Sequence, residues 1–217
     1  MVLIILSLFT TAIAQQTPLV FISAANKNIQ YIGRFDFTNK EQPAFMYSGS
    51  KIRIGFTGTS IQLHLKDGSL QNWFTVKLDD SLFVFQSDNT NGVYLLANNL
   101  PNKNHIMEIS RRTEWHGGNT HFLGFTIDAG KQLTAIKKRN QSIEFIGDSY
   151  TCGYGNEGKS HDEKFDYATE NNYLSYGAVI ARKLAANYVG ICRSGIGMYQ
   201  GYGGGIQALP NLSYTMK

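Results

Sequence analysis

The chain has 217 residues, of which 42% are hydrophobic and 17% charged, a composition typical of folded globular proteins and not of disordered ones. This length allows one large domain or two smaller ones. The formal net charge is +4, but the basic residues are scattered and the densest run covers only residues 137–139. Nucleic-acid binding usually requires a basic patch, so we expect no nucleic-acid partner.

The N-terminus has the pattern of an export signal. Residues 2–14 form an apolar run of the length of a signal-peptide core, and Ala12 and Ala14 provide a small-x-small cleavage site before the polar Gln15. The run is too short to span a bilayer. We therefore predict a signal peptide over residues 1–14, a secreted or periplasmic protein, and no membrane partner. A buried first strand is the alternative interpretation.

The next part of the chain alternates between apolar and polar residues in short segments separated by turn residues. Ile52, Ile54 and Phe56, for example, share one side of a predicted strand. The predicted strands cover residues 31–37, 51–56, 60–65, 73–78, 81–85, 92–96, 106–111 and 120–128. Eight or nine short strands at this spacing predict a β-sandwich of the jelly-roll type, to which we assign residues 15–138.

The pattern changes after this β-rich part. Residues 137–142 are polar and basic, which predicts a linker. A short apolar strand at residues 143–146 and a second strand at residues 188–192 enclose a segment with helical spacing. The apolar positions of that helix are Tyr173, Tyr176, Ile180 and Leu184. A strand, a helix and a parallel strand predict the beginning of a parallel α/β sheet, so we assign residues 143–217 to a second domain of a two-domain α+β fold.

Gly147, Asp148 and Ser149 follow the first of these two strands. In open α/β sheets, ligands bind at the carboxyl ends of the strands, so a serine at this place can be presented to a substrate. A helix that starts there would stabilise negative charge. The pattern is not the nucleophile elbow G-x-S-x-G, because Thr151 stands at the position of the second glycine. Since Gly-Asp-Ser also occurs in ordinary turns, the tripeptide alone leaves both interpretations open.

The wider sequence around Ser149 resembles the first motif block of the SGNH hydrolases, and specifically carbohydrate esterase family 2. The segment that carries the resemblance is IEFIGDSYTCGYGNE at residues 143–157, and SGIG at residues 194–197 is similar to the second block. Further similar segments are residues 31–37, 112–114, 122–125, 168–171 and 173–178. The resemblance therefore covers nearly all of the chain that would follow a signal peptide.

This resemblance implies a jelly roll joined to a flavodoxin-like SGNH hydrolase domain that removes acetyl groups from xylan, glucomannan and related plant polysaccharides. Ser149 would be the nucleophile, and its backbone N–H would donate to the oxyanion. The second oxyanion donor would be the N–H of a glycine in the second block, with Gly195 as the first candidate and Gly197 as the second. Backbone donors suit this role because they are fixed before the reaction, and one such donor contributes roughly 3 kcal/mol.

The histidine that the resemblance requires is missing. In the family, a third block supplies an oxyanion asparagine and a late block supplies the catalytic histidine. None of the five histidines follows the second block; they are His64, His105, His116, His121 and His161. A serine hydroxyl without a base is a poor nucleophile at neutral pH, so we expect an SGNH domain truncated at its C-terminus and little activity from this chain. His161, the nearest histidine to Ser149 in sequence, is expected at the surface.

Two other functions remain open, namely a non-catalytic carbohydrate-binding protein and an SGNH lipase or thioesterase, which would need an apolar acyl groove. Tyr199 and Tyr202 are equally compatible with a sugar groove and with plain packing. Cys152 and Cys192 could form a disulfide, but two buried free thiols are the preferred interpretation. The sequence has no metal-ligand spacing, and we expect neither a metal nor a cofactor.

Overall fold

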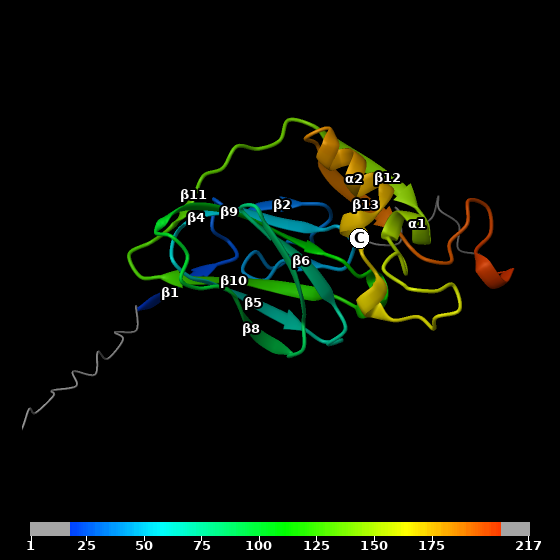
Figure 1. The fold of residues 1–217 in the computed structure, drawn as a ribbon, viewed down its shortest axis with the longest axis horizontal. Helices are drawn as coiled ribbons and strands as arrows, with labels where there is room; N and C mark the ends of the chain where they lie inside the picture. Colours follow the sequence, from blue (N-terminus) through cyan, green and yellow to red (C-terminus); the bar gives the residue numbers. More distant parts are fainter. Residues whose placement is uncertain (1–17, 205–217) are drawn as a thin grey trace, which may run out of the picture.

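Two antiparallel sheets pack face to face in the larger part of the computed structural model, which describes residues 18–204 (Figure 1). The five-stranded sheet contains β1 (Leu19–Ser23), β10 (Thr120–Asp128), β5 (Ile61–Asp67) and β8 (Asn91–Ala97) in this order, with β3 (Ala44–Phe45) paired to β10. The six-stranded sheet contains β11 (Leu133–Thr134), β4 (Lys51–Gly58), β9 (Lys103–Arg111), β6 (Trp73–Leu78) and β7 (Ser81–Gln86), with β2 (Gln30–Ile32) paired to β4. The predicted β-sandwich is thereby confirmed.

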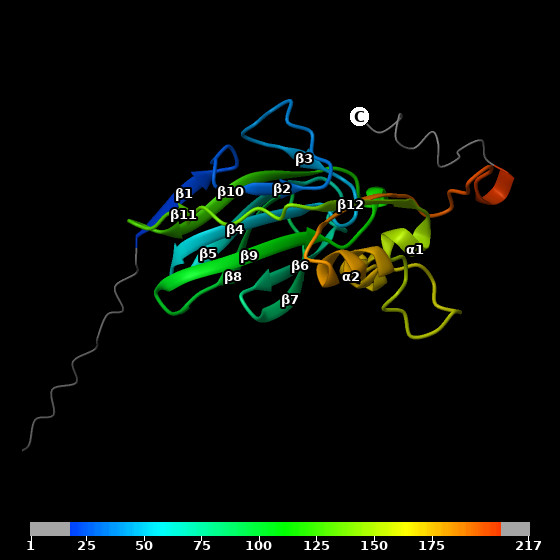
Figure 2. The same ribbon diagram turned by 90° about the horizontal axis from the view of Figure 1, so that it is seen from above.

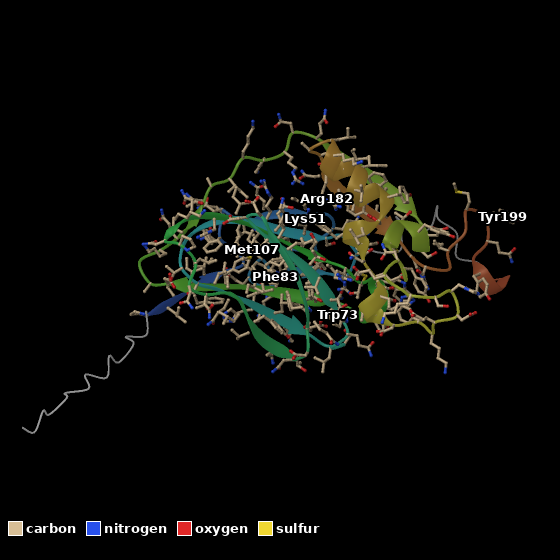
Figure 3. All side chains as sticks on the ribbon, in the orientation of Figure 1. Lys51, Trp73, Phe83, Met107, Arg182 and Tyr199 are labelled. Atoms are coloured by element: carbon tan, nitrogen blue, oxygen red, sulfur yellow. The ribbon has the colours of Figure 1, made fainter. Side chains whose placement is uncertain are left out.

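The core of the sandwich follows the alternation that the sequence displays. Ile52, Ile54 and Phe56 of β4 are 2%, 0% and 0% exposed, and they meet the inward side chains of the other sheet in one apolar cluster. Strand residues point alternately to the two faces of a sheet, so each strand contributes every second side chain to this core. Met107 and Phe83 mark the interior in Figure 3.

The strand predicted at residues 31–37 is shorter than expected. Only Gln30–Ile32 is a strand, because Gly33 turns the chain with φ +100°, and a Cβ there would lie 3.1 Å from the Cα of Ser50. Beyond the turn, Phe35 and Phe37 fold back onto Tyr31, with ring centroids 5.0 and 5.1 Å from that of the tyrosine. The aromatic residues therefore share one cluster, as their pattern indicates, without sharing a strand.

A smaller α/β unit lies at one end of the sandwich, as Figure 2 shows. Its strands β12 (Ser142–Gly147) and β13 (Asn187–Cys192) are parallel, with Gly147 opposite Cys192. Between them come the short helix α1 (Ser149–Cys152), the 3-10 turns η2 (Tyr167–Thr169) and η3 (Asn172–Leu174), and helix α2 (Tyr176–Lys183). The predicted strand–helix–strand order is confirmed, and residues 135–141 form the link between the two units.

Helix α2 packs through its smallest residues. Gly177, Ala178 and Ala181 are buried against the strands, and a Cβ on Gly177 would lie 2.8 Å from the ring of Phe145. Two residues of the apolar stripe that predicts this helix, Ile180 and Leu184, are 43% and 58% exposed, whereas Tyr176 packs edge-on against Phe145 of β12 with ring centroids 5.9 Å apart. Within residues 18–204, no helix has the length and apolar character needed to cross a membrane.

An ion-pair network fastens the link and the α/β unit to the sandwich. Glu108 of β9 accepts from Lys51 at 2.9 Å and from Arg139 of the link at 2.9 Å, and Arg53 lies 3.0 Å away. Burial lowers the pKa of the Lys51 ammonium, and the Glu108 carboxylate opposes that shift. Figure 3 places Lys51 and Arg182 together at this junction. The two units therefore share buried polar contacts and are more than neighbours along the chain.

Candidate active site

Ser149 lies where strand β12 ends and helix α1 begins. The Asp148 side chain caps this helix by accepting a hydrogen bond from the Tyr150 N–H at 3.1 Å. Ser149 is only partly buried, and no residue between positions 18 and 204 forms a hydrogen bond with its hydroxyl. The structure thus presents this serine at the carboxyl edge of the parallel strands, the edge at which ligands bind in open α/β sheets.

Two glycines shape the turn that carries Ser149. A Cβ on Gly147 would lie 2.0 Å from the Thr151 hydroxyl oxygen, so only glycine permits this close return of the chain. Gly153 ends α1 with φ +85°, and a Cβ there would lie 2.5 Å from the carbonyl oxygen of Asn171. Both positions fix where the serine stands, because neither tolerates a side chain without movement of its neighbours.

The second predicted segment follows β13 directly and therefore leaves the same edge of the sheet. Gly195 is exposed and has φ +78°, and its carbonyl oxygen accepts from Tyr202 N–H at 2.8 Å. Position 197 requires a glycine, since a Cβ there would lie 2.0 Å from the carbonyl oxygen of Gln200. Among the described residues, no acceptor pairs with the N–H groups of Ser149, Gly195 or Gly197, so all three stay available as donors.

Glu114 of the sandwich anchors this second segment. Its carboxylate accepts from the Ser194 N–H at 2.7 Å and also from the Ser194 hydroxyl. The Glu170 carboxylate accepts from the Glu114 N–H at 3.0 Å, so a third residue from the α/β unit joins the cluster. Burial and the negative charge of Glu114 raise the pKa of Glu170 to about 8. Neither glutamate was predicted as a site residue, although residues 112–114 and 168–171, which contain them, are among the segments that resemble the family.

Arg111 supports the turn that carries Glu114. Its guanidinium is buried and donates to the carbonyl oxygens of Phe45, Thr113, Glu114 and Gly118 and to the Asn72 side chain. Burial lowers the pKa of Arg111 to about 10, and the acidic neighbours oppose that shift. The Arg111 guanidinium thereby holds the turn after β9, and all of its N–H groups are engaged in these hydrogen bonds.

None of the five histidines hydrogen-bonds Ser149. His105 is buried between Asp79 (2.7 Å) and the Pro101 carbonyl (2.8 Å), and His64 contacts Thr126 at 2.6 Å. The remaining three also have other neighbours: His121 lies by Gln42, His116 by Glu114, and His161 by Asp162. The side chain of His161 is 91% exposed, which confirms its predicted surface position.

Cys152 and Cys192 are free thiols, both buried, as the sequence analysis preferred. Cys152 Sγ lies 3.6 Å from a Glu114 oxygen, and Cys192 Sγ lies 3.2 Å from the Ser48 hydroxyl. Burial, together with the adjacent Cys192 thiol, raises the pKa of Cys152. A thiol held in its neutral form is a poor nucleophile, so Ser149 remains the candidate nucleophile of this site.

Exposed tyrosines border both segments. Tyr150 follows Ser149 and is 81% exposed, while Tyr202, which contacts Gly195, is 95% exposed. Tyr199 is 92% exposed and extends from the end of the α/β unit in Figure 3. From the sequence, both packing and sugar contact were open for Tyr199 and Tyr202; their exposure excludes burial in a core among the described residues.

Comparison with known proteins agrees with this architecture. Residues 31–136 match the family model described as carbohydrate esterase 2 N-terminal. The chain therefore carries the N-terminal domain of carbohydrate esterase family 2. It is 41% identical over 180 residues to the cellulase/esterase CelE of Acetivibrio thermocellus, a match covering 82% of this chain and 22% of the relative. It is 34% identical to an acetylxylan esterase/glucomannan deacetylase of Cellvibrio japonicus, with 69% of this chain and 41% of the relative covered.

A solved family 2 esterase has the same fold. The Clostridium thermocellum enzyme, whose structure contains cellohexaose, superposes with a TM-score of 0.80 at 37% identity. The match covers 87% of this chain and 60% of that enzyme. The chain therefore spans less than two thirds of the length of each of these three relatives.

Proposed function

We propose that the chain carries the serine half of an exported carbohydrate O-acetyl esterase that acts on acetylated plant polysaccharide such as xylan or glucomannan. The observation that carries this proposal is the placement of Ser149 and of the Ser194–Gly197 segment at the same carboxyl edge of two parallel strands. The β12–α2–β13 unit would be the beginning of a flavodoxin-like SGNH domain. The family membership of the sandwich and the esterases among the relatives support the reaction class.

The proposed reaction proceeds through an acyl-enzyme. The Ser149 oxygen attacks the acetyl carbonyl carbon while its proton passes to a base, and the sugar oxygen leaves with a proton. Water then cleaves the acetyl-serine ester and releases acetate. The N–H groups of Ser149 and Gly195, or of Gly197, would stabilise the oxyanion, since all three have no partner among residues 18–204.

We propose that the base is none of the histidines of this chain, since each of the five has other neighbours and none contacts Ser149. We therefore propose that the 217 residues by themselves hydrolyse esters slowly. The same site could bind glycan without turnover, and the exposed Tyr150, Tyr199 and Tyr202 favour this as the second candidate function. Aromatic rings at a partly apolar surface are suited to packing against sugar rings.

The lipase or thioesterase alternative has less support. One cavity of the described structure, about 450 Å³, is lined by residues from Phe83 to Leu96 of the sandwich and by none from the α/β unit. Ser149 therefore does not border it. An acyl chain held there would lie outside the candidate active site.

A chimera tests the proposed function. Residues 1–204 of this chain would be joined to the C-terminal segment that the Acetivibrio relative has beyond its match, and activity would be measured on 4-nitrophenyl acetate and acetylated xylan. We expect turnover, and Ser149→Ala should lower it by about a thousandfold or more. Ser160→Ala, in the exposed loop, serves as the control and should leave it unchanged. Retained activity in Ser149→Ala would contradict the mechanism.

The 217-residue chain is measured in parallel. If it is fully active and Ser149→Ala lowers its rate, a base must come from within these residues, and His161 would be the first to test. If the chain binds cellohexaose in calorimetry but the chimera stays inactive, the carbohydrate-binding function replaces the esterase proposal.

A further inference from the structure

Three possible metal ligands meet where the sandwich contacts the α/β unit. Glu114 and His116 come from the turn between β9 and β10, which contains η1 (Trp115–Gly117), and Glu170 follows η2. One ligand atom from each of the three lies within 4.8 Å of the other two. Glu114 and Glu170 are both 1% exposed, whereas the His116 side chain is 36% exposed. The cluster is thus closed on the carboxylate side and open to solvent on the histidine side.

One oxygen of this cluster has no partner. Glu170 Oε2 accepts from the Glu114 N–H, but the buried Oε1 receives no hydrogen bond from the described residues. Buried carboxylate oxygens nearly always have a donor or a bound cation, since their desolvation is otherwise uncompensated. Glu170 Oε1 is therefore a buried acceptor that a bound cation would satisfy.

The neighbouring cations do not fill this place. The charge of Arg111 acts on Glu170 and lowers its pKa, but the Arg111 guanidinium donates its hydrogen bonds to carbonyl oxygens and to Asn72. Arg193 stacks over the ring of Trp115 at 4.2 Å. His116 Nδ1 lies 3.8 Å from Glu114 Oε2, beyond hydrogen-bond distance, and a small movement of the exposed His116 ring would bring the two atoms to the ~3.3 Å that separates tetrahedral ligands of one ion. Two buried carboxylates thus face each other with no ammonium or guanidinium group bonded to either among residues 18–204.

We propose that Glu114, His116 and Glu170 bind a divalent transition-metal ion, Zn²⁺ in the first instance, which ties the sandwich to the α/β unit. A ring nitrogen with two carboxylate oxygens is a ligand set that suits Zn²⁺, whereas Ca²⁺ and Mg²⁺ prefer oxygen ligands alone. Water can complete the coordination from the exposed side of His116. The spacing in the sequence gives no sign of this site, because Glu170 is distant from the other two ligands along the chain.

The site would also influence the candidate active site. Glu114 accepts both hydrogen bonds from Ser194, the residue before Gly195. An ion bound to the Glu114 carboxylate would restrict the same side chain that holds Ser194, and so would order the segment that supplies the second oxyanion donor. The metal would have a positioning role and take no part in proton or acyl transfer.

Metal binding is measured on the tag-free, full 217-residue chain after treatment with a chelator. Zn²⁺ is added in calorimetry, and tryptophan fluorescence is followed in parallel, because Trp115, one of the two tryptophans, lies between Glu114 and His116 in the sequence. We expect one saturable site per chain and a higher melting temperature with Zn²⁺. Co²⁺ bound in place of Zn²⁺ should show visible absorption bands, as expected for an ion with few ligands in a site of low symmetry.

Two variants and one control make the result specific. Glu170→Gln keeps an oxygen for the Glu114 N–H, and His116→Ala changes a partly exposed side chain, so both should fold; each should weaken Zn²⁺ binding by about tenfold or more. His161→Ala removes another histidine beside a carboxylate, 3.2 Å from Asp162, and should have no effect. The proposal is overturned if the wild-type chain shows no saturable Zn²⁺ binding, if both variants bind as tightly as wild type, or if Ca²⁺ binds more tightly than Zn²⁺. If Glu114 and Glu170 instead share a proton, the wild-type chain should show no saturable Zn²⁺ binding.

Discussion

Glu114 binds Ser194 twice, through the backbone N–H at 2.7 Å and through the hydroxyl, although the two residues belong to different units of the molecule. We expect Glu114→Ala to lower the free energy of unfolding by about 2 kcal/mol, because the Ser194 N–H loses a charged acceptor in a partly buried place. Urea denaturation measures this. Ser194→Ala removes only the hydroxyl contact and should cost about 1 kcal/mol. Equal stability of Glu114→Ala and wild type would show that the contact does not fasten the units.

Gly153 should not accept a side chain. Gly153→Ala combines a left-handed backbone (φ +85°) with a Cβ 2.5 Å from the Asn171 carbonyl oxygen, and we expect a loss of about 3 kcal/mol. Gly155→Ala is the matched control, because Gly155 also has positive φ (+59°) but no atom lies within 4 Å of its Cβ position. This control should cost about 1 kcal/mol. Similar losses for the two variants would mean that backbone conformation, and not the close approach, decides.

Asp128 should make the stability of the sandwich dependent on pH in acid. Burial alone would raise its pKa, but hydrogen bonds from Ser60 and Thr59 outweigh this and lower it. The folded state therefore holds this proton less tightly than the unfolded state, so its stabilisation is present above pH of about 4 and is lost as the pH falls through the folded pKa.

Asp128→Asn measures this contribution. At neutral pH we expect it to reduce the free energy of unfolding by about 1–2 kcal/mol, and the difference from wild type should shrink below pH of about 4. Asp80→Asn, at an exposed turn, is the control and should change little. A difference that stays constant down to pH 3 would exclude Asp128 as the titrating group.

The outer face of α2 should limit solubility. Ile180 and Leu184 are 43% and 58% exposed, whereas Gly177, Ala178 and Ala181 on the packed side of the helix are buried. Exposed apolar faces of this kind promote association. We expect Ile180→Lys with Leu184→Gln to raise the soluble fraction on expression, while the same kind of change at Leu82 on β7, which is 54% exposed, should help less because it lies outside this patch. Centrifugation assays decide between these outcomes.

Export remains a prediction, because residues 1–14 lie outside the residues that the structure describes. If Ala12-Ile13-Ala14 is a cleavage site, protein recovered from the medium or the periplasm should begin at Gln15. Intact mass measurement tests this. Replacing Ala14 by a bulky residue such as Trp should leave uncleaved precursor, and secreted material that retains Met1 would count against a cleaved signal.

The sequence by itself determined the division into a β-sandwich and a following α/β unit, and it indicated Ser149 as the candidate nucleophile. Alternation of period two in β4 and the carboxyl-end position of Ser149 after β12 are local properties, set by side-chain direction along a strand and by turn chemistry. Residues 31–37 were predicted as one long strand, because alternation along the chain carries no information about the close approach of Gly33 to Ser50, where the chain turns.

Only the tertiary structure decided which face of α2 is packed and which residues surround the active-site segments. The apolar stripe with Ile180 predicts an inward face, but the strands accept only the small Gly177 and Ala181 at this distance. The meeting of Glu114 with Ser194 and Glu170 joins residues far apart in sequence, and their burial, charge and hydrogen bonds exist only after the sandwich and the α/β unit have docked. Periodicity records which way neighbouring side chains point, whereas such contacts depend on how two surfaces fit together.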